Sequence, residues 1–280
     1  MLGHKLWQVL SKRFDTWATV RTLACATVKP DLLDPGKLVE GVDALNFESV
    51  VRAINSVSPD VVVNAIGIVK QISAIEDTVT TIKINALLPH QLALACRERA
   101  IRLIHISTDC VFSGRKGMYT ESDPPDPEDF YGRSKLLGEL TSFDCLTLRT
   151  SVIGPELGSA KGLLGWFLGN SGKTKTLRGY TKAIFSGFTT LVLAEIVGDI
   201  VASEPNLSGL YHVSAEPIDK YSLLCLFRET YKIPVEIQPC ADIRIDRSLD
   251  SSRFRSATGF VPPSWPKMIA SMSADPMSIT

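Results

Sequence analysis

The sequence predicts an α/β fold in which a doubly wound parallel sheet is followed by a smaller C-terminal subdomain. Three apolar runs, 59–67, 104–109 and 144–150, have the composition of strands buried on both faces of a parallel sheet. Helical patterns separate these runs, as expected when each pair of parallel strands is joined by a crossover helix. Beyond residue 150 glycines become dense and the alternation loosens, which indicates a substrate loop over the sheet.

Composition limits the class of protein. The 280 residues are 45% hydrophobic and 21% charged, enough to bury a core in one large domain or two linked ones. Because Lys plus Arg equals Asp plus Glu, at 30 each, charge favours neither a nucleic-acid partner nor an anionic membrane. No apolar run approaches the length of a membrane span, and the first residues lack the pattern of a signal peptide.

The six cysteines lie far apart and form no C-x-x-C pair. With only four histidines to add, they suggest neither disulfides nor a metal site. We interpret them as reduced thiols and expect a cytoplasmic protein that binds no metal.

Residues 1–10 predict an amphipathic helix that opens near Gly3 without a strand before it. In a dinucleotide-binding unit, a first strand enters a glycine-rich turn and the pyrophosphate lies on the N-terminus of the next helix. We therefore expect a sheet that lacks its first, central strand. Two hypotheses follow: the chain is a truncated reading of a longer gene product, or it is a degenerate relative that no longer binds a cofactor.

The next elements are predicted as follows. Residues 16–21 form the second strand and end on Arg21, where an arginine accommodates the 2′-phosphate of NADPH and an acid would accept from the ribose of NADH. A merely exposed arginine is the alternative. Asn46 caps a helix to Ser56, and Pro89 kinks a helix over residues 81–100. Later elements are a helix over 188–201, a strand over 209–213, a helix over 219–231, a strand over 235–238 and a final helix after Trp265.

The stretch from Ser107 to Glu139 carries the chemistry. Thr108 ends a predicted strand, and Tyr131 and Lys135 are four residues apart on one face of the helix that follows. Hydride transfer to a carbonyl needs a proton at the oxygen, and a lysine beside a phenol lowers the pKa of that phenol. An accidental Tyr-x-x-x-Lys is the alternative, but the strand end and the loop rich in turn residues favour a site.

Several segments carry a resemblance to a known family: Ser107–Phe112, Tyr119–Glu121, Tyr131–Glu139, Leu148–Thr150 and Arg247–Ser251. Together they resemble the extended short-chain dehydrogenases/reductases, and most of all the branch of the dTDP-4-dehydrorhamnose reductases. The resemblance implies a Rossmann-type sheet, in which Gly3 matches the last glycine of the family's fingerprint. It also implies a dinucleotide-binding domain of residues 1–150 joined by 186–215, and a substrate-binding subdomain of residues 151–185 and 216–280.

The resemblance assigns roles to single residues. Catalysis falls to Thr108, Tyr131 and Lys135. Cofactor binding falls to Gly3, Arg21, Asp43 facing adenine, Asn64, Ala65 and Gly67 beside the nicotinamide ribose, Asn85 supporting the lysine, Tyr131 and Lys135. Substrate binding falls to Thr108, Asp109 and Arg149. Trp166 and Lys182, in the glycine-dense segment, are available for the diphosphate and base of the substrate, and the alternative is that they are merely exposed.

Residues near the catalytic threonine select the reaction. Related 4,6-dehydratases carry Thr-Asp-Glu, and cysteine cannot replace that glutamate as a base in Thr108-Asp109-Cys110. Related epimerases carry two small hydroxyl residues at the last two positions. The resemblance therefore implies NADPH-dependent reduction of the C4 ketone of a nucleotide-linked 4-keto-6-deoxy sugar, as in dTDP-L-rhamnose biosynthesis, by a protein compatible with homodimer formation. The alternatives are a UDP-linked 4-keto sugar reductase and a non-catalytic regulatory subunit similar to the beta subunit of methionine adenosyltransferase.

Overall fold

The computed structural model describes residues 1–22, 35–69, 77–141, 145–157, 160–170 and 172–275. Cys25 and Asp144, which entered the predictions above, lie outside the described residues. The helices are α1 (Leu2–Leu10), α2 (Phe47–Val57), α3 (Thr78–Thr81), α4 (Leu88–Arg97), α5 (Phe130–Leu137), α6 (Leu163–Gly169), α7 (Thr190–Ser203), α8 (Lys220–Tyr231), α9 (Ser252–Thr258) and α10 (Trp265–Ala274). Shorter turns are the 3₁₀ segments η3 (Pro35–Lys37) and η6 (Asp109–Val111) and the π-helical segment η5 (Ile82–Leu87).

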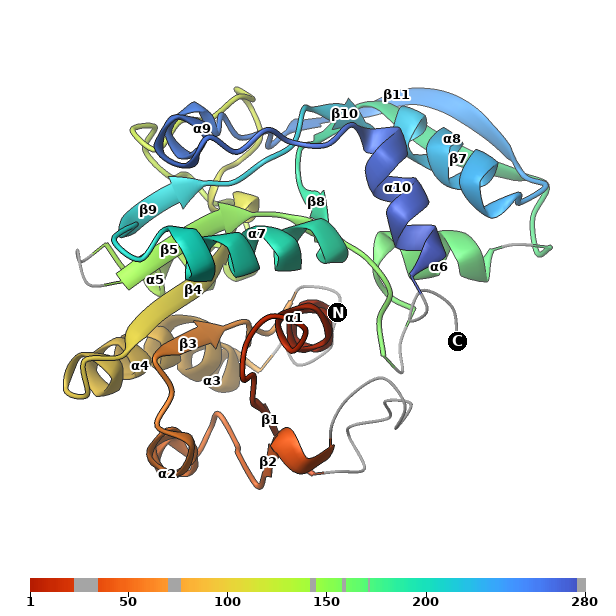
Figure 1. Ribbon diagram of the computed structural model, residues 1–280. Coiled ribbons are helices and arrows are strands. Elements are labelled where there is room, and N and C mark those ends of the chain that lie inside the picture. The colour runs from red at the N-terminus through yellow and green to blue at the C-terminus, as the bar shows by residue number, and fades with distance from the viewer. Residues whose placement is uncertain (23–34, 70–76, 142–144, 158–159, 171, 276–280) are drawn as a thin grey trace.

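The strands are β1 (Ala18–Val20), β2 (Leu38–Glu40), β3 (Val61–Asn64), β4 (Arg102–Thr108), β5 (Cys145–Thr150), β6 (Val152–Ile153), β7 (Thr176–Phe185), β8 (Phe188–Thr189), β9 (Gly209–His212), β10 (Ile218–Asp219) and β11 (Glu236–Asp246). Four of them form the central parallel sheet in the order β3-β4-β5-β9. Helices cover both faces, so the predicted parallel α/β fold is confirmed (Figure 1).

The parallel pair β1-β2 is separate from this sheet. Between β1 and β3 lies a cavity of about 680 Å³, lined mainly by apolar side chains of α1, α2, β1, β2 and β3. Among the described residues, β1 pairs only with β2 and β3 pairs only with β4, so each leaves one edge without a ladder partner. This is the break expected from a sheet that lacks its first strand.

The side chains of β4 alternate between two cores, as the period of a strand requires. Ile104 packs in the larger cluster with α1 and α7, whereas Leu103 packs in a smaller cluster with Leu88 and Leu92 of α4. Both strand residues are fully buried. Their alternation fixes which β4 side chains face α4 and α5 and which face α1 and α7.

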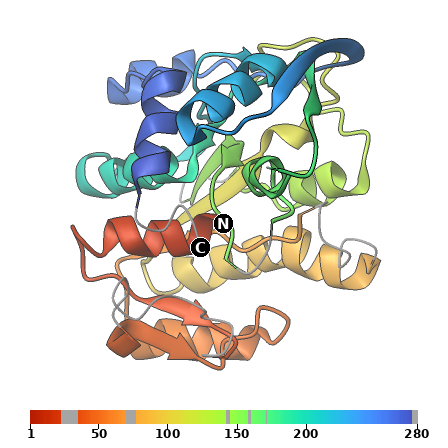
Figure 2. The same ribbon diagram turned by 90° about the vertical axis from the view of Figure 1, so that its right-hand side faces the viewer.

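A second, three-stranded sheet has the order β10-β7-β11 and packs against α8. Figure 2 shows this part at one end of the molecule and the β1-β2 pair with α2 at the other, with the central sheet between them. Strand β9 returns to the central sheet beside β5. The segment 151–185, expected to be a substrate loop, instead contains α6 and the ten-residue strand β7, and β11 runs well beyond the predicted strand over 235–238.

One local prediction differs from the structure. Asn46 precedes α2, but its side chain makes no capping hydrogen bond. The kink at Pro89 stays a prediction; the helical stretch runs from Thr78 to Arg97, and the π-helical segment η5 comes just before Leu88 and Pro89. Because proline has no N–H to donate, the carbonyl of Asn85 loses its usual i+4 partner, and the chain widens there.

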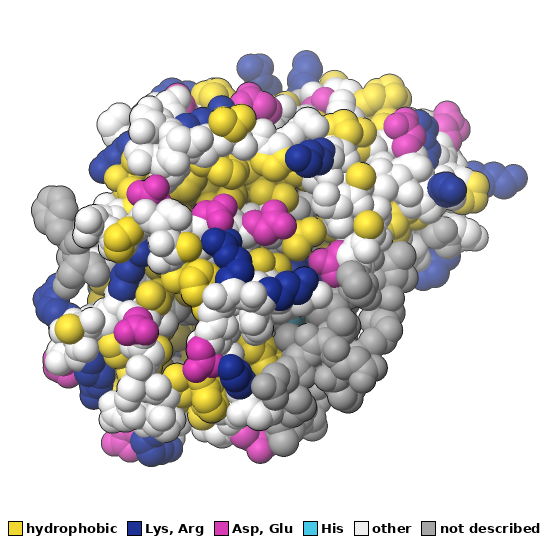
Figure 3. Space-filling view, viewed as in Figure 1, with side chains coloured by type: hydrophobic (Ala, Val, Ile, Leu, Met, Phe, Trp, Pro, Cys, Tyr) yellow, Lys and Arg dark blue, Asp and Glu magenta, His cyan; other side chains and the backbone are white. Residues whose placement is uncertain are grey.

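Within the described residues, no helix has the length and apolar character needed to cross a bilayer. The same residues contain no cluster of three or more His, Cys, Asp or Glu side chains placed to hold a metal ion. Figure 3 shows basic and acidic side chains interspersed over one face, in line with the balanced charge of the sequence.

Candidate active site

Thr108 ends β4 and lies at the carboxyl edge of the central sheet. Its hydroxyl oxygen accepts a hydrogen bond from the backbone N–H of Cys110 at 3.1 Å, which turns the chain into η6. Its hydroxyl hydrogen points to a carboxylate oxygen of Asp109 at 3.2 Å. The threonine side chain is buried and held in one orientation by its own turn.

Tyr131 lies in the first turn of α5, which Asp129 caps by accepting from the N–H of Gly132 at 2.7 Å. Burial raises the pKa of Tyr131 above its ordinary value, the neighbouring Cys110 thiol adds to the rise, and the Thr108 hydroxyl opposes it. The sequence-based expectation of a lowered phenol pKa is therefore wrong for this geometry, because burial outweighs the other effects.

Lys135 lies one turn further along α5 and is almost fully buried. Its ammonium donates to the backbone carbonyl of Ile106 in β4, with Nζ at 2.9 Å from the oxygen. Burial lowers the pKa of Lys135 to about 8, and the carboxylate of Glu139 opposes that fall. Thr108 at the end of β4 and Tyr131 and Lys135 on α5 thus lie at the junction of these two elements, and their catalytic role stays a prediction.

Asn85 fixes α5 from behind. Its amide nitrogen donates to Ser134 Oγ at 3.0 Å and to the carbonyl of Ile68 at 2.9 Å, and its amide oxygen accepts from the N–H of Ile68. Ser134 lies between the tyrosine and the lysine on the helix and donates to the carbonyl of Tyr131 at 2.8 Å. Asn85 therefore supports Lys135 through the helix, without contacting it directly.

Asn64 ends β3 and faces His105 across the ladder. Its amide oxygen accepts from the N–H of Ile66 at 3.1 Å, so its nitrogen is the atom that faces Nδ1 of His105 at 3.1 Å. Ala65 follows directly and lines the cavity beside β3. A Cβ added at Gly67 would make only an ordinary van der Waals contact with Asn85, so there is open space beside this glycine. Ala65 and Gly67 thus form a wall of small residues.

The residues predicted to bind the far end of a dinucleotide lie apart from the catalytic group. Gly3 opens α1 and lines the cavity. Arg21 follows β1 with an exposed side chain, and its carbonyl accepts from the N–H of Gly41. Asp43 is half-buried and accepts from the N–H of Leu45 at 3.0 Å.

Besides Thr108, two of the predicted substrate residues are buried, Asp109 and Arg149. Burial raises the pKa of Asp109, and the nearby Arg247 guanidinium opposes that rise. Arg149 in β5 is 4% exposed and forms a two-pronged ion pair with Glu139, at 2.8 and 2.7 Å. Its predicted role as a substrate ligand does not fit the structure, because its guanidinium is committed to a partner inside the core.

The other two predicted substrate residues lie on exposed surfaces beyond the central sheet. Trp166 lies on α6 and is 40% exposed. Lys182 lies on β7 with an exposed side chain. Neither makes a side-chain interaction with Thr108, Tyr131 or Lys135 in the described structure.

Sequence reasoning missed the residues that connect the site to the core. Arg247 donates to the carbonyl of Phe112 at 2.8 Å and places Nη1 3.8 Å from the sulfur of Cys110. Ser107 donates to Glu139 at 2.6 Å. Arg247, Ser107 and Glu139 all lie in the segments that resemble the family, which was the one sequence signal for them. No spacing rule shows that residues 107, 139, 149 and 247 interact.

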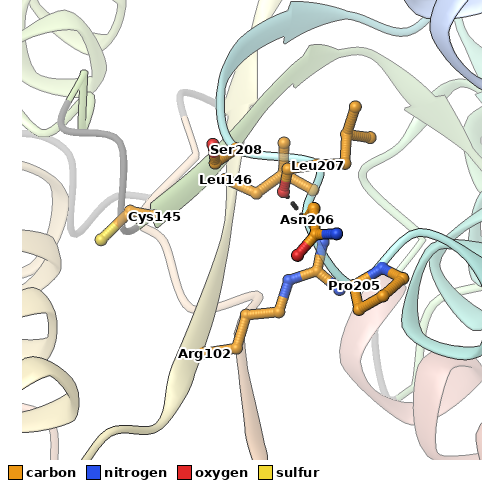
Figure 4. Close-up of a pocket in the computed structure, with 7 residues that line it drawn as sticks. All are labelled: Arg102, Cys145, Leu146, Pro205, Asn206, Leu207 and Ser208. Carbon is orange, nitrogen blue, oxygen red and sulfur yellow. Dashed lines mark hydrogen bonds between the residues drawn. The ribbon is translucent and has the colours of Figure 1, made fainter.

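A separate small pocket of about 250 Å³ surrounds Arg102 at the opposite, amino edge of the sheet (Figure 4). The guanidinium of Arg102 donates to the carbonyls of Ile200, Glu204 and Leu207, which lie at or just beyond the end of α7. These bonds satisfy the free carbonyls of a helix C-terminus. The pocket is therefore part of a helix cap and is remote from Tyr131.

The three predicted catalytic residues offer groups that suit a carbonyl oxygen. The Thr108 hydroxyl acts on the Tyr131 phenol, and the buried ammonium of Lys135 follows one helical turn later on α5. This arrangement suits proton transfer to an oxygen that gains negative charge as hydride arrives at its carbon.

Comparison with known proteins agrees with this chemistry. The chain is 27% identical over 260 residues to the dTDP-4-dehydrorhamnose reductase of Aggregatibacter actinomycetemcomitans, which covers 83% of this chain and 87% of that protein. A crystal structure of a hypothetical dTDP-4-dehydrorhamnose reductase from Sulfolobus tokodaii matches with a TM-score of 0.77 and 27% identity over 94% of each chain. The Bacillus anthracis dTDP-4-dehydrorhamnose reductase in complex with NADP shares the fold, with a TM-score of 0.73 and 20% identity over 89% of this chain and 92% of that one.

The chain spans about 60% of the length of the first curated relatives that it matches. The family profile described as "RmlD substrate binding domain" matches residues 1–277, nearly the whole chain. With the parallel sheet, the Thr108–Tyr131–Lys135 group and this match together, the chain belongs to the RmlD substrate binding domain family.

Proposed function

We propose that this protein uses NADPH to reduce the C4 ketone of a nucleotide-linked 4-keto-6-deoxy sugar, in the manner of a dTDP-4-dehydrorhamnose reductase. The observation that carries the proposal is the convergence of a hydroxyl, a protonated phenol and an ammonium at the junction of β4 and α5. Membership of the family supports the same reaction.

The residues present fit the nicotinamide end of such a cofactor. Ala65 and Gly67 leave room beside β3, and Lys135 offers an ammonium to a ribose. Bound NADPH supplies the hydride. Tyr131 transfers its phenol proton to O4 of the sugar, which the raised pKa allows because the phenol stays protonated at neutral pH. Thr108 orients the same oxygen through its hydroxyl.

For the rest of the cofactor we propose Gly3 at the pyrophosphate, Asp43 at the adenine, and Arg21 at the 2′-phosphate. The exposed guanidinium of Arg21 at the end of β1 supports NADPH over NADH. Asn64 and Asn85 support the walls of the site from the core.

For the substrate we propose Thr108 and Asp109 at the sugar, with Trp166 and Lys182 at the nucleotide. This assignment divides the chain by role. Residues 1–150 and 186–215 bind the cofactor, and residues 151–185 and 216–280 bind the substrate. The second sheet around β7, which lies apart from the central sheet, supports that division.

The test is a substrate and cofactor panel. Purified protein is mixed with NADPH or NADH and with a dTDP-linked or UDP-linked 4-keto-6-deoxy sugar, and loss of reduced cofactor is followed with product analysis. We expect turnover with NADPH and the dTDP-linked sugar. Turnover with the UDP-linked sugar alone would assign the alternative substrate class, and absence of turnover with every pair would contradict reduction.

A second candidate function is a non-catalytic regulatory subunit, similar to the beta subunit of methionine adenosyltransferase. The cavity between β1 and β3 favours it, because among the described residues no strand pairs with the facing edges of β1 and β3. Capture of one stoichiometric enzyme partner from cell extract, combined with failure to oxidise NADPH, would support this function. Turnover without a partner would exclude it.

We further propose that the protein forms a homodimer through the outer faces of α4 and α5 and acts in the cytoplasm. Val79, Leu87, Leu94 and Leu137 on or beside these helices are about half exposed or more, an unusual density of exposed leucine and valine. Light scattering should give a dimer mass that Leu94→Glu with Leu137→Glu reduces to a monomer. The described cysteines form no disulfide, which suits a reducing compartment, and cell fractionation tests the location.

A further inference from the structure

A buried ion pair lies directly behind the catalytic helix. Glu139, just beyond the end of α5, accepts from Nε of Arg149 at 2.8 Å with one carboxylate oxygen and from Nη2 at 2.7 Å with the other. The first oxygen also accepts from the hydroxyl of Ser107 at 2.6 Å. Both charged side chains are about 5% exposed. A buried pair with this geometry holds β4, β5 and α5 together.

Histidine fixes the orientation of the arginine. Nη1 of Arg149 lies 3.2 Å from Nε2 of His212, and Nδ1 of His212 lies 2.8 Å from the carbonyl oxygen of Tyr119. Because a carbonyl only accepts, Nδ1 carries the ring proton and Nε2 accepts from the arginine. Burial lowers the pKa of His212 to about 4, with Arg149 adding to the fall, so the ring is neutral at neutral pH. The positive charge in this cluster therefore resides on Arg149.

The ion pair is connected to Lys135 through β4. Nζ of Lys135 donates to the carbonyl oxygen of Ile106 at 2.9 Å, and the next residue, Ser107, donates to Glu139. Glu139 also follows Lys135 by four residues, and its carboxylate opposes the effect of burial on the pKa of Lys135. Ser107 immediately precedes Thr108. One carboxylate thus connects the lysine, the strand that ends on the catalytic threonine and an arginine in the next strand.

We propose that Glu139 is a positioning residue for Lys135, and that Arg149 controls how strongly the Glu139 carboxylate acts on the lysine. The proposal deepens the function proposed above and rests on it for its catalytic meaning. It gives Arg149 a role in place of the substrate contact expected from the sequence.

The physical basis is competition between two cations for one carboxylate. Arg149 stays charged at any relevant pH and holds Glu139 with two hydrogen bonds, which leaves Lys135 with part of its attraction. The other titratable group that acts on Lys135 is His105 of β4, whose ring is kept neutral by burial, with Lys135 and His90 adding to the effect. Because His105 is neutral, changes at Glu139 and Arg149 should reach Lys135 without a competing titration.

Substitutions of the two partners of the ion pair should therefore shift the pKa of Lys135 in opposite directions. Glu139→Gln removes the negative charge, so the pKa of Lys135 should fall by about one unit or more. Arg149→Met leaves the carboxylate with Lys135 as its nearest cation, so the same pKa should rise. If the ion pair were purely structural, both variants would be less stable but would not shift the pKa of Lys135 in opposite directions.

The experiment measures Lys135 directly in the purified protein without substrate. Lysine is labelled with ¹³C at Cε, the Lys135 resonance is assigned by its absence in Lys135→Met, and its midpoint is titrated by NMR. We expect a lower midpoint in Glu139→Gln and a higher one in Arg149→Met. An unchanged midpoint in Glu139→Gln, or a lower midpoint in Arg149→Met, would overturn the proposal.

Two further variants keep the test decisive if a single substitution fails to fold. Glu139→Gln with Arg149→Met removes the whole pair, which buried pairs tolerate better than loss of one partner, and should lower the midpoint as Glu139→Gln does. Lys5→Met breaks the buried ion pair between Lys5 of α1 and Asp275, which follows α10. This pair does not involve Glu139 or Arg149, so the variant should leave the Lys135 midpoint unchanged. A shift in Lys5→Met of the same size as in Glu139→Gln would contradict the proposal.

The pH profile of NADPH oxidation is a second readout. The alkaline limb should move to lower pH in Glu139→Gln and to higher pH in Arg149→Met, because the reaction uses the ammonium form of Lys135. If the wild-type protein oxidises no NADPH, the proposed function fails, while the NMR titration still decides the role of Glu139.

Discussion

The two parallel sheets on either side of the cavity differ in how firmly their strands are held. In the central sheet, β4 has a partner on each side, and its residues Leu103, Ile104 and His105 are fully buried. In the other sheet, β1 and β2 have three residues each and face a cavity of about 680 Å³, and within the described ranges they pair only with each other. The proposed catalytic residues belong to the first region, and the proposed adenosine contacts belong to the second.

This difference teaches that the two halves of the proposed cofactor site are determined by different interactions. The proposed catalytic end is held by several interactions. They are the hydrogen bonds from Asn85 to Ser134 and from Lys135 to Ile106, and the ion pair between Glu139 and Arg149. The other end depends on a two-stranded unit of marginal independent stability and on helix α1. The following predictions test whether the two regions separate in this way, from the largest effect to the smallest.

The largest effect is expected at Tyr131, in the firmly held region. Tyr131→Phe removes the proton donor and should lower the rate of ketone reduction by about 10²- to 10⁴-fold, because general acid catalysis is worth that much. Steady-state rates with NADPH measure it. Tyr180→Phe on β7 is the control and should retain the rate. A Tyr131→Phe enzyme with full rate would remove the phenol from the mechanism.

Hydrogen exchange compares the two regions directly. Backbone amides of β1 should exchange about 10³-fold faster than those of β4, because the two-stranded unit can open without disrupting the central sheet. Exchange of Val20 against Ile104, followed by NMR or mass spectrometry, gives the ratio. Equal protection at the two sites would mean that both sheets unfold as one cooperative unit.

Burying the ammonium of Lys135 should lower the stability of the folded protein. The folded protein releases the proton of Lys135 near pH 8, whereas an unfolded lysine keeps it to about pH 10.5. The unfolded state therefore binds more protons between these values, and stability rises with pH in this window. At neutral pH the buried ammonium costs about 3 kcal/mol, from about 1.4 kcal/mol for each pKa unit.

Lys135→Met should remove the cost of burying the ammonium, and with it the rise in stability between about pH 8 and pH 10.5. Urea unfolding of wild type and variant across the window gives the difference, in which the contributions of Cys96 and Tyr131 cancel. We expect the variant to be more stable by about that amount at neutral pH and the two to converge toward pH 10.5. A variant that is less stable at neutral pH would show that the ammonium stabilises the fold.

Gly138 tests the packing between α5 and η5. A Cβ at this position would lie 2.0 Å from the backbone carbonyl oxygen of Asn85, so Gly138→Ala must displace a backbone that cannot yield easily. We expect a loss of about 1–3 kcal/mol in unfolding free energy. Gly169→Ala in α6 is the matched control, with no atom within 4 Å of the added carbon, and should be neutral or gain about 0.5–1 kcal/mol.

The positions of the proposed catalytic residues on a strand and a helix could be predicted because the signals are local. Thr108 at a strand end and Tyr131 and Lys135 at helical spacing need only short-range geometry. The helix over residues 1–10 was also predicted from the spacing of its apolar residues, and α1 occupies Leu2–Leu10. Both features depend on neighbours within a few residues.

The parts that sequence did not predict depend on tertiary burial. The fall expected for the phenol pKa of Tyr131 became a rise because burial outweighs the other effects. Arg149 was expected at the substrate, but Glu139 holds it inside the core. The strand β7 lay in a glycine-dense segment that resembles a loop until β11 pairs with it. No local pattern contains these three-dimensional contacts.

The smallest effect is expected in the weakly held region. Ala53 of α2 is buried and lines the cavity, so Ala53→Leu can add apolar contacts without displacing packed atoms. We expect a gain of about 0.5–2 kcal/mol in unfolding free energy, as is common for filling cavities. Ala93 of α4 is also buried but lies in the smaller packed core and not on the cavity wall. Ala93→Leu should therefore lose about 1–3 kcal/mol by overpacking. Opposite signs for these two matched alanines in urea unfolding would show that the cavity is real free space in solution, and equal losses would show that the β1-β2 region packs closed.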